Sequence, residues 1–372
     1  MTRHETFLRF LRTALWGEHV DLTGKELTMG QYQSLMQLAN EQAVAGLFGQ
    51  VLMDSGIRLP KQAAMEVYSL VEHIRQRNEV MDQALAHLCR DLQRIGVRFV
   101  VFKGQTLARH YPCPALRQSG DIDFAVHPED WKRAIEFFQQ EWQAQITDNN
   151  SDKHIEFEIE GVQYELHRKL TSFAYPRHQR YWEERVMAEV WEHIEQVEIG
   201  GALVPVMAPV YNVLYTFVHI FFHLIIEGIG LRQFCDWSLT IHNSQFTIHK
   251  SPLEKHLKGI GLEKAYTGLG ALLTDYLGLP EERFPFTITA DDHKRAPRLM
   301  ENIWEMGNFG HNKPQASSRG IRNGLMRLSR TAGQARQFHH YAPAEAWWRI
   351  PYIFKWWGTK LGRKVKRLGI KN

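Results

Sequence analysis

Three acidic residues have the types and the spacing that divalent-metal chemistry requires. In Asp121–Val126, polar and apolar residues alternate, which predicts a strand with Asp121 and Asp123 on one face. Glu165 lies on the polar face of a second predicted strand, Val162–His167. Like charges that share a face repel each other, and carboxylate oxygens are ligands that Mg²⁺ and Mn²⁺ prefer. The three acids are therefore candidate metal ligands, although the D-x-D pattern alone also fits two solvated acids on an edge strand.

A Lys-Gly pair precedes these acids and is a candidate phosphate-binding bend. Val97–Phe102 is a run of β-branched and aromatic residues, which predicts a buried strand, and Lys103 and Gly104 follow it directly. Glycine lets the backbone approach a ligand closely, and lysine adds a positive charge. A plain turn into a short helix at Gln105–His110 is the alternative interpretation.

The other strand of the predicted hairpin, His154–Glu160, carries two rival acids. Glu156 and Glu158 lie on its polar face, and we expect both to be solvated. Glu165 is the better candidate for completing a two-cation site, in which metal ions about 3.5–4 Å apart hold the attacking and leaving oxygens of a phosphoryl transfer.

Taken in order, these motifs resemble those of the nucleotidyltransferase superfamily of the DNA polymerase β type. Within it they are similar to a bacterial branch that is often encoded beside capsular and surface polysaccharide genes. The ordered set covers about residues 30–310. It consists of Lys103-Gly104, Tyr111-Pro112, Arg117-x-x-Gly120-Asp121-Ile-Asp123, Glu165-Leu-His167, His223, Leu231-Arg232-x-x-x-Asp236 and Gly307-Asn-Phe-Gly310.

The resemblance implies transfer of a nucleoside monophosphate from an NTP to a hydroxyl acceptor, which could be a sugar, a lipid-linked glycan, a protein or an RNA end. It implies Mg²⁺ or Mn²⁺ as cofactor, held by Asp121, Asp123 and Glu165, with Glu165 near the attacking hydroxyl. Such catalysis consists mainly of positioning and charge neutralisation. The resemblance also implies a set of nucleotide-binding residues: Lys103, Gly104, Gln105, Arg117, Gly120, His167 and Arg232.

The composition is that of a globular protein. The chain has 372 residues, of which 44% are hydrophobic and 23% charged, and this excludes a collagen-like, coiled-coil or wholly disordered chain. Three cysteines without C-x-x-C spacing predict a reducing cytoplasm, and the start of the chain predicts no secretory signal. The apolar run Val213–Ile226 is shorter than the roughly 20 residues of a bilayer span, so we expect a buried helix.

The charge is unevenly distributed along the chain. Residues 306–372 hold 14 Lys and Arg but one acid, Glu345, which gives this part +13 and leaves −9 for the rest. An excess of this kind predicts an anionic partner, either a membrane surface or another polyanion, and a place at the inner membrane face. The aromatic and basic stretch Ala346–Trp357 could dock on the body, lie on a membrane or bind single-stranded nucleic acid.

The order of predicted elements indicates an α+β fold with a small mixed sheet between helical regions. We expect an N-terminal helical region at 1–96, a nucleotidyltransferase-like core at 97–207, a helical domain at 208–310 and a basic aromatic tail at 311–372, with a loop over 307–330. His219 and His223 have zinc-compatible spacing, but an otherwise apolar helix favours core histidines. Two alternatives remain: a catalytically silent relative that binds a nucleotide or polymer, and a nucleic-acid-binding module that uses the tail.

Overall fold

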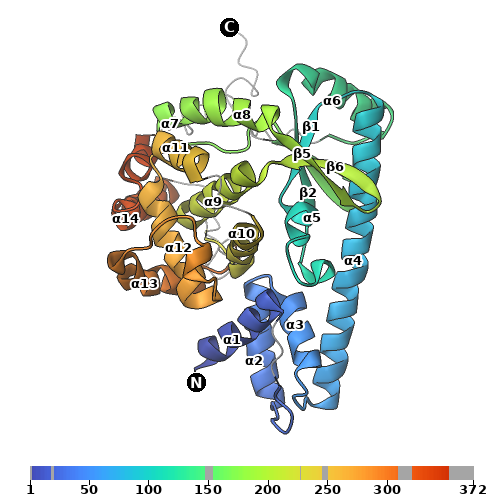
Figure 1. The fold of residues 1–372 in the computed structure, drawn as a ribbon, viewed down its shortest axis with the longest axis vertical. Coiled ribbons are helices and arrows are strands. Elements are labelled where there is room, and N and C mark those ends of the chain that lie inside the picture. The colour runs from blue at the N-terminus through green and yellow to red at the C-terminus, as the bar shows by residue number, and fades with distance from the viewer. Residues whose placement is uncertain are drawn as a thin grey trace.

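The protein folds around one mixed β-sheet. The computed structural model describes residues 2–17, 21–146, 154–226, 228–244, 250–308 and 321–351. Within these residues, six strands pair in the order β3-β4-β2-β1-β6-β5 and helices surround them (Figure 1). The predicted α+β fold with flanking helical regions is confirmed. Two parts of the tail predicted at 311–372, residues 311–320 and 352–372, lie outside the described residues.

The N-terminal region is helical, as predicted. Thr2 and Thr28 each accept a hydrogen bond from the third residue of the following helix and form capping boxes, which fixes where the first two helices begin. The fourth helix has 34 residues, about 51 Å at about 1.5 Å per residue, and runs from the small N-terminal bundle to the sheet (Figure 1). These helices are α1 (Arg3–Trp16), α2 (Met29–Glu41), α3 (Ala45–Asp54) and α4 (Lys61–Arg94).

The strands lie close to where the sequence placed them. β2 pairs antiparallel with β1 and parallel with β4, so the two acid-bearing strands are direct neighbours in the centre of the sheet. β3 and β4 form the predicted hairpin, and β5 and β6 form another. The strands are β1 (Phe99–Phe102), β2 (Asp121–Val126), β3 (His154–Ile159), β4 (Val162–His167), β5 (Ile194–Ile199) and β6 (Ala202–Met207).

Short helices link these strands. The sequence placed a helix near α6 and α5 but none in the segment from 176 to 192, where apolar residues are sparse. That segment forms two α-helices joined by a π-helical turn, Trp182–Val186. The helices are α5 (Gly104–Ala108), α6 (Trp131–Gln140), α7 (Pro176–Tyr181) and α8 (Met187–Glu192), with 3₁₀ turns at Pro114–Leu116, Pro128–Asp130 and Glu281–Arg283.

The C-terminal half is helical. The loop expected over 307–330 is wrong from residue 321 onward, where α14 begins; its Gly-, Ser- and Asn-containing sequence concealed the helix. α9 is long and apolar enough to cross a membrane by length and composition, but 72% of that stretch is buried inside the protein, in agreement with the predicted core helix. The helices are α9 (Pro209–Ile226), α10 (Leu231–Asn243), α11 (Lys250–Ile260), α12 (Glu263–Leu277), α13 (Ala290–Met306) and α14 (Ile321–Phe338).

The two faces of the sheet have different partners, and this positions the acids. Ile122, Phe124 and Val126 of β2 pack into a core with α4 and α6. On the opposite face, Phe102 of β1 meets Tyr215 of α9 edge to face, with ring centroids 5.1 Å apart. Because side chains alternate along β2, the acids project toward the α9 side of the sheet. The functional groups therefore lie between the sheet and the helical half.

Candidate active site

The three predicted acids meet. β2 and β4 are parallel neighbours, and their register places Asp123 directly beside Glu165. Ligand oxygens of Asp121, Asp123 and Glu165 all lie within 4.8 Å of one another. Glu156, a rival in the sequence, forms a contact of 2.8 Å with His154 instead, between its Oε1 and the ring Nε2. Carboxylates 40 or more residues apart in the chain thus form one cluster.

The cluster opens into a cavity of about 550 Å³, within the usual size range of small-molecule sites. Its wall combines the bend after β1, the facing ends of β2 and β4, the segment after β4, and one side each of α9 and α10. Polar groups dominate the sheet side, while α9 adds aromatic rings. Lining residues with polar groups include Lys103, Ser119, Asp121, Asp123, His154, Glu165, His167, Lys169, Thr171, Ser172, Tyr215, His219 and Arg232.

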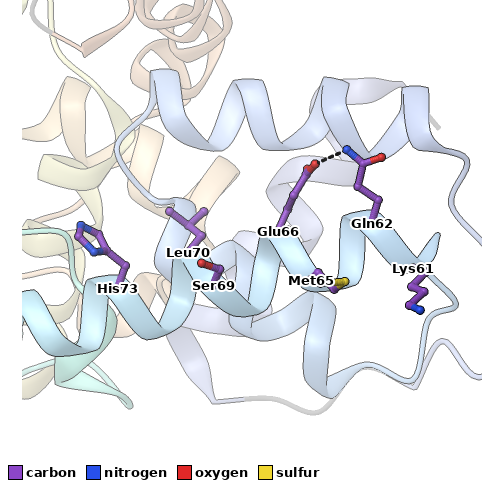
Figure 2. A pocket seen from close by; sticks show the side chains of 7 residues that line it. All are labelled: Lys61, Gln62, Met65, Glu66, Ser69, Leu70 and His73. Atoms are coloured by element: carbon purple, nitrogen blue, oxygen red, sulfur yellow. Dashed lines mark hydrogen bonds between the residues drawn. The ribbon is translucent and has the colours of Figure 1, made fainter.

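A larger hollow lies elsewhere, along the first half of α4 (Figure 2). Its volume is about 1030 Å³, and Met65 in its wall is 65% exposed. The one carboxylate in its lining, Glu66, is hydrogen-bonded by the Gln62 amide (Figure 2). Because no set of catalytic groups converges in this hollow, the smaller cavity is the candidate active site.

Lys103 holds an unusual backbone conformation at the cavity edge. Its φ is +58°, which non-glycine residues rarely adopt, and its Nζ lies 2.9 Å from Asp123 Oδ1. Gly104 follows with φ +38°, and a Cβ on it would stand 3.3 Å from the Asp121 carbonyl oxygen. The Lys-Gly pair is thus a tight bend directly against the acid-bearing strand, as the sequence suggested.

His167 lies inside the acid cluster. Its Nε2 is 2.8 Å from Asp123 Oδ1 and 3.2 Å from Glu165 Oε2. Burial alone would lower the pKa of His167, but the hydrogen bonds to the two carboxylates outweigh burial and raise it. His167 was predicted to contact the nucleotide; in this structure its contacts are with the acids that surround it.

The two aspartates differ in pKa because their neighbours differ. The nearby charge of Asp123, followed by burial, raises the pKa of Asp121 to about 6. For Asp123, burial would raise the pKa, but Lys103 and His167 together lower it below its usual range. Asp123 is therefore an ionised, neutralised carboxylate. Asp121 is repelled by the charge of Asp123, and a bound cation would reduce this repulsion.

Arg117 is engaged in a buried ion pair. Its Nε and one terminal nitrogen each contact a different oxygen of Asp236 at 2.7 Å, and Asp236 also accepts a hydrogen bond of 2.6 Å from Tyr111. The remaining terminal nitrogen donates to Ser119 Oγ at 2.8 Å. Most of the guanidinium's donors are thus occupied, and the pair connects the segment before β2 to α10. Arg117 therefore helps to position the site as well as lining the cavity.

Arg232 differs from Arg117 although the two lie close together. Arg232 and Asp236 are four residues apart on α10, a spacing that permits an ion pair, but Asp236 pairs with Arg117. Arg232 donates from one terminal nitrogen to the Gln118 carbonyl oxygen at 2.7 Å and lines the cavity. Among the described residues, its Nε has no hydrogen-bond partner. This guanidinium is better placed than Arg117 to bind an anion.

Gln105 and Gly120 occupy different positions relative to the cavity. The side-chain amide of Gln105 donates to Asp82 on α4 at 2.5 Å, and this residue is not part of the cavity wall. The predicted nucleotide contact of Gln105 is therefore limited to its main chain. Gly120 does line the cavity, directly before Asp121, and a Cβ there would meet nothing within 4 Å.

Sequence reasoning missed part of the wall. Tyr215 and Lys169 line the cavity, and neither lies in a recognisable motif. His219 and His223 also line it, with ring centroids 4.3 Å apart. Burial lowers the pKa of His219 well below its ordinary value, and the nearby Lys103 charge adds to this. Both histidines line the cavity rather than the core, and in the described part of the chain neither belongs to a group of three potential metal ligands.

Comparisons with known proteins identify the family of this chain. Residues 29–278 match a family described as an uncharacterised nucleotidyltransferase. No curated protein matches the chain. Among solved structures, it is distantly similar to an antigenic nucleotidyltransferase-like protein from Paracoccidioides brasiliensis, with 12% identity, a TM-score of 0.33, and coverage of 55% of this chain and 95% of that one. The family match spans well over half of the chain and includes every residue of the acid cluster, so the protein belongs to this nucleotidyltransferase family.

Proposed function

We propose that this cavity transfers a nucleoside monophosphate from an NTP to a hydroxyl acceptor, with Mg²⁺ or Mn²⁺ as cofactor. The observation that supports it best is the convergence of Asp121, Asp123 and Glu165 within 4.8 Å on two neighbouring strands. Two lysines and two arginines line the same cavity, so the site combines metal ligands with cations that suit a triphosphate.

The acid cluster fits a divalent metal ion. It offers oxygen ligands only, and the raised pKa of Asp121, about 6, shows that the negative charges are incompletely balanced. Asp121, Asp123 and Glu165 would hold the metal, which when bound neutralises phosphate charge and activates the attacking oxygen. This donor set favours Mg²⁺ or Mn²⁺ over ions that prefer nitrogen or sulfur ligands.

The remaining groups bind and orient the substrates. Arg232 is positioned to contact the triphosphate, because its Nε has no hydrogen-bond partner within the described part of the chain. The Lys103–Gly104 bend places both its main chain and the Lys103 ammonium at the edge of the cavity, beside the acid cluster. Glu165, which lines the cavity from β4, is the acid assigned to the acceptor hydroxyl. The reaction then proceeds by alignment and charge neutralisation, without a covalent enzyme intermediate.

For the acceptor, we propose a glycan hydroxyl in surface polysaccharide metabolism. Support for this comes from the motif order, which resembles that of a bacterial branch associated with polysaccharide genes. The cysteines favour the cytoplasm, because Cys89, Cys113 and Cys235 are all free thiols. The basic C-terminal tail supports a location against the inner face of the membrane, where lipid-linked acceptors are held.

The test is to incubate the purified protein with each NTP and with Mg²⁺ or Mn²⁺. Pyrophosphate release and the mass of the labelled product are the readouts. We expect turnover by the wild type, loss of at least about a hundredfold in Glu165→Gln, and wild-type turnover in Glu158→Gln, because Glu158 is an exposed acid on the same hairpin. Binding of NTP without turnover would instead identify a silent nucleotide-binding relative. Absence of both binding and turnover would refute the proposal.

A further inference from the structure

The β3–β4 hairpin carries a second cluster of potential ligands, with a different chemistry from the acid cluster. β3 contains His154-x-Glu156 and β4 contains Glu165-x-His167. The antiparallel register places His154 opposite His167 and Glu156 opposite Glu165. Because side chains alternate along a strand, all four project from the same face of the hairpin. Two short, mirrored motifs thus form a square of two imidazoles and two carboxylates.

Three of these side chains are close enough to bind one ion. Ligand atoms of His154, Glu165 and His167 all lie within 4.8 Å of one another, and the two imidazole centroids are 5.1 Å apart. Both histidines also line the cavity, so an ion has a route to them. Two imidazoles and a carboxylate form the kind of ligand set that binds zinc and related transition ions, whereas the all-oxygen triad suits Mg²⁺.

The fourth residue, Glu156, is placed to orient a ligand. A carboxylate can only accept, so the contact of 2.8 Å between Glu156 Oε1 and His154 Nε2 is a hydrogen bond donated by the imidazole. This leaves Nδ1 of His154 as the nitrogen with a free lone pair. A carboxylate that fixes the tautomer of a ligating histidine is the usual arrangement around protein-bound metals.

His167 is the third potential ligand, and its Nε2 proton is shared between two carboxylates. Its Nε2 lies between Asp123 and Glu165, at 2.8 Å from one carboxylate oxygen and 3.2 Å from the other. A divalent ion that replaces this proton adds one positive charge beside the carboxylates of Asp123 and Glu165. It also gains Glu165 as a ligand without displacing the strand on which either residue lies.

We propose that His154, Glu165 and His167 form a transition-metal site of the zinc type, with Glu156 positioning His154. This site differs from the acid cluster in its donor atoms and shares Glu165 with it. It needs no nucleotide and no turnover, so it can exist whether or not the protein transfers nucleotides. Three protein ligands leave one coordination position open toward the cavity.

The experiment uses Co²⁺ as a spectroscopic probe and Zn²⁺ as its competitor, on the full chain without nucleotide. We expect one bound Co²⁺ per chain, a visible ligand-field band, paramagnetically shifted imidazole proton signals from two histidines, and displacement by Zn²⁺. His154→Ala should weaken Co²⁺ binding at least about tenfold, and Glu156→Gln by about 10- to 100-fold. Asp121→Asn, which alters only the acid cluster, should keep the band and both imidazole signals.

Three results would overturn the site: no stoichiometric Co²⁺ binding by the wild type, unchanged binding in His154→Ala, or loss of the imidazole signals in Asp121→Asn. Circular dichroism and thermal unfolding verify that each variant is folded. If His154→Ala unfolds, His154→Asn preserves a polar side chain of smaller size, and the same expectation applies to it. NTP turnover is measured separately, so failure of this site and failure of the proposed function are distinguishable.

Discussion

The ammonium of Lys103 lies 2.9 Å from Asp123, the most deeply buried acid of the cluster, which is 2% exposed. Burial alone would lower the pKa of Lys103, but the charge of Asp123 outweighs it and raises the pKa above the usual value. The positive φ of Lys103 is therefore held by a buried ion pair at the end of β1. The protein itself therefore balances part of the negative charge of the cluster, and an external cation would balance the rest.

Replacing Asp123 by Asn should destabilise the protein. The change leaves the Lys103 ammonium without its carboxylate, and breaking a buried pair costs about 3–5 kcal/mol of unfolding free energy. The double variant Lys103→Met/Asp123→Asn removes both charges and should recover most of this loss. Urea unfolding measures both. A loss below about 1 kcal/mol in the single variant would contradict the expectation.

Replacing Asp121 by Asn should have the opposite effect, and the effect should depend on pH. The pKa of Asp121 is raised from 3.8 to about 6 in the folded protein, so the folded state binds more protons than the unfolded state between these values. Its ionisation therefore destabilises the fold progressively from about pH 4 and fully above about pH 6. Asp121→Asn should be more stable by roughly 1–3 kcal/mol at pH 7.5 and equal to wild type near pH 3.5. Unfolding curves at both pH values test this, and equal stability at pH 7.5 would refute it.

Arg117→Gln should lower the free energy of unfolding. It removes a guanidinium that is 4% exposed and leaves Asp236 buried without its cation, which costs about 3–5 kcal/mol. Arg117→Lys should recover little, because an ammonium cannot reproduce the two-pronged contact with Asp236. Denaturant unfolding with Arg133→Gln, a surface arginine, as control measures the difference. Wild-type stability of Arg117→Lys would argue against the two-pronged pair.

Arg232→Gln should weaken NTP binding if the cavity holds the triphosphate. It loses one hydrogen bond to the Gln118 carbonyl, worth about 1 kcal/mol of stability, and the cavity loses a cation. We expect the Kd for NTP to rise by roughly tenfold or more, with a smaller stability loss than in Arg117→Gln. Calorimetric titration of NTP into both variants tests the split. The reverse order, with Arg117→Gln folded but unable to bind NTP, would assign the phosphate contact to Arg117.

Glu345→Gln should release the C-terminal segment from the body. Glu345 is fully buried and accepts hydrogen bonds from the main-chain N–H groups of Ala174 and Tyr175 and from the His178 ring. The amide keeps the shape but replaces one acceptor oxygen with a donor that faces a donor, a cost of about 1–3 kcal/mol. Hydrogen exchange over residues 173–178 should become faster. The exposed Glu282→Gln serves as control, and equal exchange rates in the two variants would contradict the anchoring role.

Local sequence patterns predicted the strands that carry the acids, because each of these strands has its own alternation of polar and apolar residues. The alternation in Asp121–Val126 and the hairpin with its glycine turn led to β2 and β4 with their observed bounds. The period of two also determined that Asp123 and Glu165 lie on polar faces. What periodicity could not give was the parallel pairing of β2 with β4. The motif resemblance implied only that the three acids act together at one metal site.

Long-range pairings were beyond sequence reasoning. Asp236 offers Arg232 a partner four residues away, but the helix axis directs Asp236 toward Arg117, which is 119 residues away. Gln105 looked like a phosphate ligand because it follows Gly104, yet α4 packs close enough for Asp82 to take its amide. In both cases the choice of partner depends on helix packing, which no local pattern encodes.

The apolar character of α9 has a consequence during protein synthesis. α9 packs on α10, α11 and β6, and its Phe217 stacks edge to face on Tyr266 of α12. Three of these partners, α10, α11 and α12, are made after α9, and α12 ends at Leu277, about 50 residues beyond Ile226. At typical ribosomal speed, that delay lasts about 3–10 s. During that interval the nascent polypeptide exposes a hydrophobic segment. Chains truncated just after α9 are expected to require chaperones or to aggregate.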